Sequence, residues 1–544
     1  MTNYIIYDFA SMKLPSLLLV IVFVSVSSSA IPPGSTIDIK HYVFTIELND
    51  STDVIYGDAI VHLSVVKATS EIELDLMEKM SAGKGMAVSA LYVDERKVAF
   101  VHRNGKLVAT LEQPVAAGSN LRLQIHYSGI PADGLIIGKN KYGDRTFFGD
   151  NWPNRARHWL PVVDHPADKA TVEFKVIAPP FYEAIANGLK VEESFLDKRR
   201  KLTHWREDVA LPTKVMVIGV ARFAIQYAGK INDIPVEHWV YPQNRKEGFG
   251  DYSAASRILE FFVRQIGPYP YKKLANVQSK TMYGGMENAS NIFYFENSVN
   301  GKADHNDLIA HEIAHQWFGD SASEIDWHHV WLSEGFATYF AHLYNEFVLG
   351  PEQRARAMLA DRKTIAAFHK QKVLPVVFET LPRNLLEILS PNSYQKGSWV
   401  LHMLRHQVGD TAFFRGVRQY YKEYQQSNAA TGDFQRVMEQ ASARDLSGFF
   451  RQWLYTPGHP VLEASWLYNE RSKEIEIVVN QVQNGNIFRF PLEIEVESGS
   501  GEKKLEKIEI SEKTGKYSIK YDKKPVQMRL DPYVNLLLEG DFKN

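Results

Sequence analysis

The stretches HEIAHQW, residues 311–317, and WLSEGFATY, residues 331–339, decide what this chain can fold into. On an α-helix, positions i and i+4 lie on one face, so His311 and His315 can direct both imidazoles at one cation. Glu334 follows His315 after eighteen residues, where a second helix is expected to begin near Ser333. Two antiparallel helices would place Glu334 opposite the histidines. Two nitrogens and one carboxylate with an open fourth position are the ligands of a catalytic zinc site. We therefore expect one zinc ion (Zn2+) per chain, held by His311, His315 and Glu334.

The residue between the two histidines supplies the base for such a site. Glu312 lies beside the expected ligands and can take a proton from an attacking water, then deliver it to a leaving amine. Other interpretations remain open at this point. An isolated HExxH pattern can be a solvated or capping pattern, and Glu334 can be a carboxylate that serves a helix dipole. His328 and His329 are competing ligands, although their place in the linker favours a structural or surface role.

Composition limits the remaining possibilities. The chain has 544 residues and is therefore too long for one hydrophobic core, since single cores stop growing near roughly 250–300 residues. The formal net charge is -2 at pH 7, which argues against a basic face and a nucleic-acid partner. Cysteine is absent, so disulfides, thiolate nucleophiles and cysteine-ligated zinc are excluded. Any metal must be held by His, Asp and Glu.

The hydrophobic pattern divides the chain into three structural regions, giving a multidomain α+β protein. Residues 31–225 mostly alternate with period two and predict a β domain. Residues 226–457 predict a mainly helical domain with a few strands near its start. Residues 458–544 alternate again and predict a β-sandwich. The helical runs are expected at residues 252–266, 304–319, 333–349, 351–370, 394–408, 410–426 and 431–454.

The first thirty residues have the pattern of a targeting segment. Lys13 precedes an apolar run from Leu14 to Val26, and Ser28-Ser29-Ala30 offers a small-residue cleavage site. This pattern predicts a secretory signal peptide over residues 1–30. The alternative is a signal anchor that stays in the membrane, but the run is short for a spanning helix of about 20 residues. We expect an exported protein, periplasmic or extracellular, with no stable membrane span after cleavage.

A third motif connects the metal site to a known family. Tyr283-Gly284-Gly285-Met286-Glu287-Asn288 matches the GxMEN exopeptidase signature, about two dozen residues before the zinc helix. Together with HEIAHQW and WLSEGFATY, it resembles the M1 zinc aminopeptidases, the gluzincin group that includes aminopeptidase N and leukotriene A4 hydrolase. The resemblance covers nearly the whole chain after residue 30. It implies a saddle-like N-terminal β-sheet domain, a thermolysin-like catalytic domain and a C-terminal β-sandwich. Relatives add a C-terminal helical domain, so the resemblance implies a short form with a more open site.

The resemblance also implies roles for single residues. Glu287 would bind the free α-amine of the substrate, with Gly284, Gly285 and Met286 lining the peptide, and Tyr394 would stabilise the oxyanion. The alternatives are a buried salt-bridge partner for Glu287, an ordinary turn for the glycines and a core position for Tyr394. Asp150 falls where many relatives have a second anchor for the amine, and its alternative is a turn or helix-cap residue.

These roles imply an aminopeptidase that hydrolyses the N-terminal peptide bond of peptides with a free N-terminus. A zinc endopeptidase is the first rival, and Glu287 argues against it. An inactive binding protein on the same fold is the second, and Glu312, Tyr394 and the zinc ligands argue against it because all are present. A lipid epoxide hydrolase is the third, and it is disfavoured by the length of the chain. The preferred N-terminal residue is not encoded in a recognisable motif.

Overall fold

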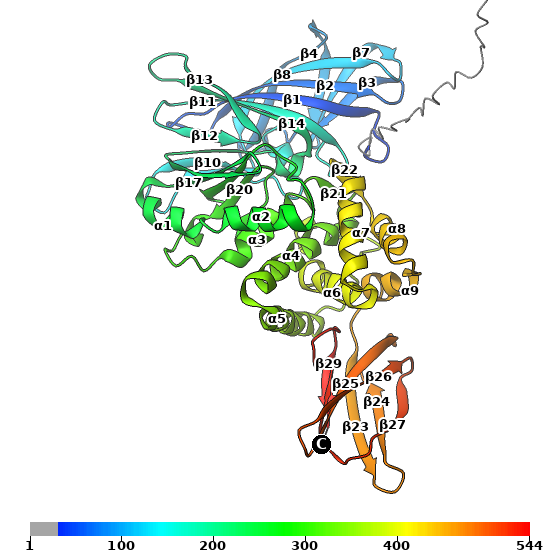
Figure 1. Ribbon diagram of the computed structural model, residues 1–544. Coiled ribbons are helices and arrows are strands. Elements are labelled where there is room, and N and C mark those ends of the chain that lie inside the picture. Colours follow the sequence, from blue (N-terminus) through cyan, green and yellow to red (C-terminus); the bar gives the residue numbers. More distant parts are fainter. Residues whose placement is uncertain (1–30, 544) are drawn as a thin grey trace, which may run out of the picture.

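The computed structural model describes residues 31–543, so the predicted signal peptide lies outside the described residues. Three regions follow one another along the chain (Figure 1). A broad β-rich region comes first, a helical region lies beneath it, and a group of C-terminal strands extends from the far side of the helices. No helix within residues 31–543 is long and apolar enough to cross a membrane.

The largest N-terminal sheet is built around β1. Residues Tyr42, Phe44 and Ile46 alternate toward the core and are fully buried, as the period-two pattern predicts. β1 pairs antiparallel with β2 and parallel with β11. In spatial order the sheet contains β13 (Leu189–Phe195), β14 (Lys201–Pro212), β11 (Lys169–Ala178), β1 (Ile37–Glu47), β2 (Ile55–Val65), β8 (Asn120–Ile130), β4 (Gly85–Val93) and β5 (Arg96–Lys97).

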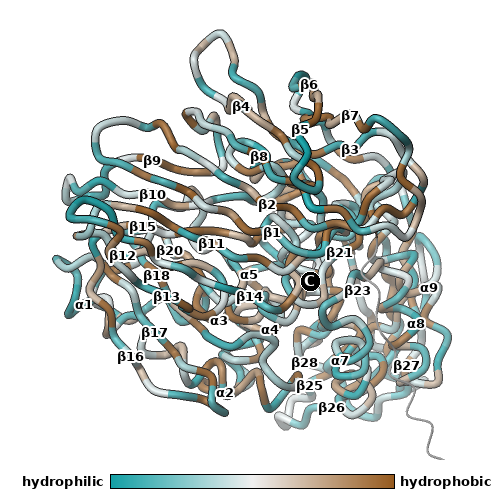
Figure 2. The backbone as a smooth tube through the Cα atoms, turned by 90° about the horizontal axis from the view of Figure 1, so that it is seen from above, coloured by the Kyte–Doolittle hydropathy of each residue, from teal (hydrophilic) through white to brown (hydrophobic). Residues whose placement is uncertain are grey.

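Two smaller sheets complete this region. One contains β3 (Thr69–Asp75), β7 (Lys106–Val115) and β6 (Ala99–Arg103). The other contains β12 (Glu183–Ala186), β15 (Ile218–Ala221), β10 (Arg145–Gly149) and β9 (Leu135–Lys139). Figure 2 shows these strands running side by side, with hydrophobic and hydrophilic stretches alternating along them.

The helical region opens with a sheet that carries one wall of the site. Its order is β16 (Ala224–Ile231), β17 (Ile234–Val240), β18 (Leu274–Ser279), β20 (Asn291–Phe295) and β19 (Gly285–Met286). β19 is the last strand in this order and pairs antiparallel with β20. Its other edge is therefore available to an extended peptide.

The helix over Arg245–Asp251 was not predicted, and the helices after it follow the predicted order with differences at their ends. The helices are α1 (Arg245–Asp251), α2 (Ala255–Gln265), α3 (Asn306–His315), α4 (Trp331–Leu349), α5 (Pro351–His369), α6 (Gly397–Val408), α7 (Asp410–Tyr424), α8 (Thr431–Ser442) and α9 (Ser447–Phe450). The single helix expected over 431–454 is wrong: Ala443 adopts a left-handed conformation with φ 54° and ends α8. The helix expected over 304–319 ends earlier, at His315, and is followed by a turn in which Gly319 has φ 118°.

The helix expected over 394–408 begins instead with a π-helical turn, Asn392–Lys396, which continues into α6. This turn lies very close to α4. A Cβ atom on Gly335 would lie only 2.9 Å from the Cα atom of Gly397. Two glycines therefore allow the backbones of α4 and α6 to touch, which a larger residue at either position would prevent.

The C-terminal strands form two sheets. The first contains β27 (Thr514–Lys520), β24 (Glu474–Gln481), β23 (Val461–Asn469) and β29 (Glu539–Phe542), and the second contains β26 (Lys503–Ile510), β25 (Phe490–Ser498) and β28 (Pro525–Leu530). Each sheet buries one apolar face, represented by Ile475 and Ile477 in β24 and by Leu492, Ile494 and Val496 in β25. These features agree with the β-sandwich expected from the sequence.

Candidate active site

Three side chains from two antiparallel helices converge in a cavity of about 430 Å³ beneath the N-terminal sheets. His311 and His315 lie one turn apart on α3, and their Nε2 atoms are 3.0 Å apart. Glu334, in the first turn of α4, places its Oε2 atom 3.5 Å from His311 Nε2 and 3.2 Å from His315 Nε2. The structure therefore brings together the three donor atoms that the sequence spacing places on facing helices.

The outer side of His315 is held by two hydrogen-bond acceptors. Its Nδ1 atom lies 3.1 Å from the carbonyl oxygen of Phe318 and 3.0 Å from Ser333 Oγ. A proton on Nδ1 donates to these oxygens and leaves the Nε2 lone pair directed at the centre of the cluster. This arrangement orients a metal-binding imidazole and fixes its tautomer.

The charges around the cluster favour a cation. Burial opposes the charging of His315, but the carboxylates of Glu334 and Glu287 raise its pKa to about 10. Burial also opposes ionisation of Glu334, yet the two imidazoles outweigh burial and lower its pKa. Two nitrogens and one carboxylate oxygen, with further carboxylates nearby that favour positive charge, are a set of donors that fits a zinc ion.

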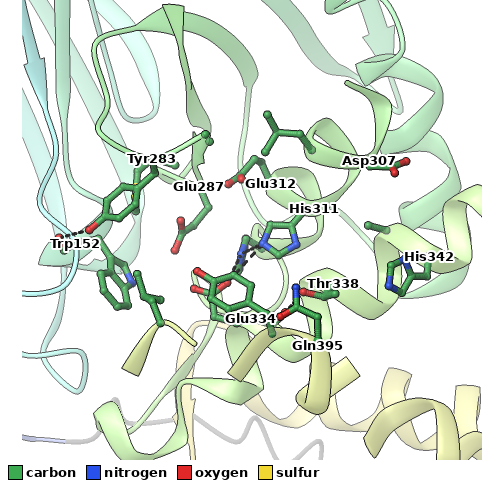
Figure 3. Close-up of a pocket in the computed structure, with 18 of the residues that line it drawn as sticks. Trp152, Tyr283, Glu287, Asp307, His311, Glu312, Glu334, Thr338, His342 and Gln395 are labelled. Atoms are coloured by element: carbon green, nitrogen blue, oxygen red, sulfur yellow. Dashed lines mark hydrogen bonds and ion pairs between the residues drawn. The ribbon is translucent and has the colours of Figure 1, made fainter. Parts of the chain in front are cut away.

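Glu312 lies against the backbone of β19. A Cβ atom on Gly285 would lie 2.3 Å from Glu312 Oε1, so the glycine leaves the space that this carboxylate occupies. Donor atoms of Glu312, Glu287 and His315 lie within 4.8 Å of one another. Burial raises the pKa of Glu312 well above its ordinary value. The carboxylate thus lies beside the His-His-Glu cluster and faces the cavity (Figure 3).

Glu287 is a buried carboxylate that lacks a complete set of partners. Its backbone carbonyl accepts a hydrogen bond of 2.7 Å from Gln316 Nε2, which fixes the end of the GGMEN segment against α3. The side chain is 5% exposed, and its Oε1 atom has no hydrogen-bond partner among residues 31–543. Burying a carboxylate without hydrogen-bond partners costs free energy, and a cationic ligand that paired with Glu287 in the cavity would offset that cost.

Tyr394 covers the other side of the His-His-Glu cluster. Its ring is stacked on that of His311, with the centroids 5.9 Å apart and the planes 17° apart. Burial raises the pKa of its phenol, and the nearby carboxylates of Glu334 and Glu287 raise it further, so the hydroxyl keeps its proton and can donate it. Tyr394 lies in the π-helical turn before Gly397, so the contact between Gly335 and Gly397 sets its distance from Glu334.

Asp150 is held by hydrogen bonds outside the cavity lining. Its carboxylate is fully buried and does not line the cavity. It accepts three hydrogen bonds: one of 2.8 Å from Arg155 Nη2, one of 3.2 Å from Thr281 Oγ1 and one of 3.0 Å from the Met282 backbone N–H. With both oxygens bonded in this way, Asp150 presents no free oxygen to the cavity, and its role as an amine anchor stays a prediction. Its contacts hold the segment that leads into GGMEN.

The two competing histidines also lie outside the cavity. His328 Nδ1 pairs with Asp326 at 2.9 Å, and His329 Nδ1 lies 2.9 Å from Thr431 Oγ1. Both contacts belong to the linker before α4, which agrees with a structural role.

The cavity contains residues that the sequence motifs did not reveal. Beside Tyr283, which belongs to the quoted motif, its lining includes Trp152, Asp307, Thr338, His342, Asp361 and Gln395. Figure 3 labels all of these residues except Asp361. Asp307 precedes His311 by four residues and Thr338 follows Glu334 by four, so helical spacing from the known ligands could have found both. Asp361 lies on α5 and has no such local signal.

Comparisons with known proteins cover both the N-terminal sheets and the helical region. The model for the peptidase M1 N-terminal domain matches residues 39–215, and the model for the peptidase family M1 domain matches residues 251–453. The chain is 26% identical over 472 residues to aminopeptidase 2 of Candida albicans, covering 81% of this chain and 49% of that protein. It is 27% identical over 403 residues to leucyl aminopeptidase of Saccharolobus solfataricus, covering 69% of this chain and 50% of that protein. The chain thus spans about half the length of the curated relatives it matches.

The fold has a counterpart among solved structures. An M1 zinc metallopeptidase from Deinococcus radiodurans matches with a TM-score of 0.66 and 25% identity, covering 78% of this chain and 95% of that one. The two domain models cover the N-terminal sheets and the helices that carry the His-His-Glu cluster. This chain therefore belongs to peptidase family M1.

Proposed function

We propose that this protein is a zinc-dependent aminopeptidase that removes the first residue of peptides with a free N-terminus. The observation that carries the proposal is the unpaired, buried carboxylate of Glu287 beside a His-His-Glu metal site. A carboxylate in that place pairs with the substrate ammonium group. Because the anchored amine lies next to the metal ligands, only the first peptide bond reaches the reacting position.

Each side chain around the cavity has a separate role in the proposed reaction. His311, His315 and Glu334 would hold zinc, which when bound polarises the scissile carbonyl and makes water a better nucleophile. Glu312 accepts the proton of the attacking water on its carboxylate and returns it to the leaving amine nitrogen. Tyr394 donates a hydrogen bond to the carbonyl oxygen as negative charge develops there. Gly284, Gly285 and Met286 offer the open edge of β19 to the backbone of the peptide.

Paired substrates test the proposal. Purified zinc-loaded protein is given a free peptide and its N-acetylated counterpart, and release of the first residue is followed by mass spectrometry. We expect cleavage of the free peptide alone. Glu287→Gln keeps the size of the side chain but removes its charge, and should raise KM for the free peptide at least about tenfold. Glu352→Gln, an exposed position on α5, is the matched control.

The same assay separates the rival functions. Cleavage of the acetylated peptide at internal bonds would identify an endopeptidase and would show that Glu287 does not anchor a substrate amine. A protein that binds zinc and free peptides but cleaves neither would be a binding module. Hydrolysis of a lipid epoxide, measured directly, would support the remaining rival.

We also propose that the protein is exported, on the basis of the apolar run and small-residue site within residues 1–30. N-terminal sequencing after expression in a secreting host tests this. The expected mature protein begins near Ile31 and is recovered outside the cytoplasm, whereas an uncleaved chain in the membrane fraction would indicate a signal anchor.

A further inference from the structure

The direction of a bound peptide follows from the way β19 lies along α3. Glu287 adjoins the C-terminal end of α3, where its backbone carbonyl accepts a hydrogen bond from the side chain of Gln316. Gly285 lies against Glu312, and a Cβ atom on Gly284 would lie 3.9 Å from Leu308 Cδ1 near the start of that helix. A peptide with its amine at Glu287 and its backbone along β19 therefore runs antiparallel to β19. Its leaving portion extends toward the N-terminal end of α3.

Carboxylates line the cavity at that end. Asp307 lies one turn before His311, and its Oδ1 atom accepts a hydrogen bond of 2.5 Å from Asn345 Nδ2 on α4. Asp361, on α5, pairs with His342 Nε2 at 2.8 Å. Figure 3 shows Asp307 and His342 on the far side of the metal ligands from Glu287. The two carboxylates thus come from different helices and are held in place by neighbouring side chains.

The charge of the lining is one-sided. Among residues 31–543, neither lysine nor arginine lines this cavity, whereas Asp307 and Asp361 both do, together with the catalytic carboxylates. The distance along α3 from His311 to Asp307 is about 6 Å, at about 1.5 Å per residue. An extended peptide advances about 3.3 Å per residue, so its first or second residue after the scissile bond reaches this wall.

We propose that Asp307 and Asp361 make the enzyme select peptides with lysine or arginine at the first or second position after the scissile bond. This inference rests on the proposed aminopeptidase function and adds the substrate class. A cationic side chain there meets two carboxylates in a recessed cavity, whereas an acidic side chain meets like charge and finds no lysine or arginine in the lining to bind. Asp307 also lies in the first turn of α3, where a carboxylate stabilises the helix dipole. The two aspartates are therefore tested separately.

The test compares three peptides that differ at one position: Ala-Lys-Ala-Ala, Ala-Gln-Ala-Ala and Ala-Glu-Ala-Ala, each amidated. We expect kcat/KM for the lysine peptide to exceed that for the glutamate peptide about tenfold or more, with glutamine between them. The ratio should fall toward one at high salt, since the interaction is electrostatic. Asp361→Asn and Asp307→Asn should each lower the ratio at least about threefold, and the double variant should lower it further.

Each ratio is measured on a single enzyme preparation, so partial loss of folded protein in a variant cancels. Asp304→Asn is the matched control, because this exposed aspartate lies just before α3 but outside the cavity lining. Its ratio should equal that of the wild type. A wild-type ratio near one, or a ratio that neither substitution changes, would overturn the inference.

An aminoacyl arylamide reporter, which has an uncharged leaving group, separates this inference from the proposed function. If the reporter is hydrolysed while the lysine-to-glutamate ratio is near one, the charge selection is wrong and the aminopeptidase proposal stands. If neither the reporter nor any peptide is hydrolysed, the proposed function fails and this inference fails with it.

Discussion

Within residues 31–543, two pairs of histidines place their ring nitrogens in contact, and only one of these pairs is joined by a third potential metal donor. In the catalytic pair, the Nε2 atoms of His311 and His315 are 3.0 Å apart. In the second pair, the Nδ1 atoms of His369 and His459 are 2.7 Å apart. Both pairs border a cavity, so access alone does not separate them.

The difference is the third donor. Glu334 brings a carboxylate oxygen to both catalytic nitrogens, whereas the outer nitrogens of the second pair face Asn392 Oδ1 at 2.8 Å and Glu539 Oε1 at 2.9 Å. Within residues 31–543, groups of three potential metal donors within 4.8 Å occur at the catalytic cavity and not at the second pair. The second pair instead joins α5, the π-helical turn and strand β29, which is a structural role.

Removing the third donor should have the largest effect. Glu334→Gln keeps the shape of the side chain but removes the charge that pairs with both imidazoles. We expect zinc, measured by plasma mass spectrometry after dialysis, to fall from one per chain to less than about a tenth of that, with activity lost in parallel. Full zinc occupancy in this variant would show that Glu334 is not a ligand.

The contact between α4 and α6 gives the next largest effect. Gly397→Ala introduces a Cβ atom 2.9 Å from the Gly335 backbone, which must move Tyr394 relative to the metal ligands. A displacement of about 1 Å in a catalytic group can reduce kcat about 100-fold. Gly432→Ala, where a Cβ atom meets nothing within 4 Å, is the matched control and should keep the wild-type rate. Equal rates in the two variants would contradict the positioning role of this contact.

The second histidine pair should affect stability rather than metal content. His369→Gln removes a ring that bonds both Asn392 and His459 in a buried place. We expect the free energy of unfolding to fall by about 1–3 kcal/mol in urea denaturation, with zinc still at one per chain. Loss of zinc in this variant would mean that the two pairs are not independent.

The smallest effect is a change in pH dependence. Burial lowers the pKa of His369 to about 4, below the value of about 6.5 in an unfolded chain. Between these values the unfolded chain binds more protons, so this stabilising contribution is complete above about pH 6.5 and is lost as the pH falls toward 4. His369→Gln should reduce the slope of stability against pH in this window by at most about 1.4 kcal/mol per unit. An unchanged slope would show that His369 does not titrate in this way.

The sequence predicted the parts of the site that depend on local spacing. The two histidines lie four residues apart on one helix, and Glu334 lies at a fixed distance along the chain. The order of sheets, helices and C-terminal strands also followed from hydrophobic periodicity. These features are encoded within single elements or short connections, where spacing alone sets the geometry.

Features that depend on packing between distant segments were missed or misplaced. Asp150 was predicted either as an anchor of the substrate amine or as a turn or helix-cap residue, and no local pattern indicated its hydrogen bonds with Arg155, Thr281 and Met282. Asp361 reaches the cavity only because α5 packs beside α4, and no motif marks it. The end of α8 at Ala443 depends on a left-handed conformation that is usual for glycine and that an alanine does not predict.

Anomalous diffraction at the zinc absorption edge, from crystals of the zinc-loaded protein, tests the central claim most directly. The account predicts a single peak bounded by His311 Nε2, His315 Nε2 and Glu334, with no density between His369 and His459. A peak at the second pair, or no peak at the first, would contradict the assignment of the metal site and the aminopeptidase function built on it.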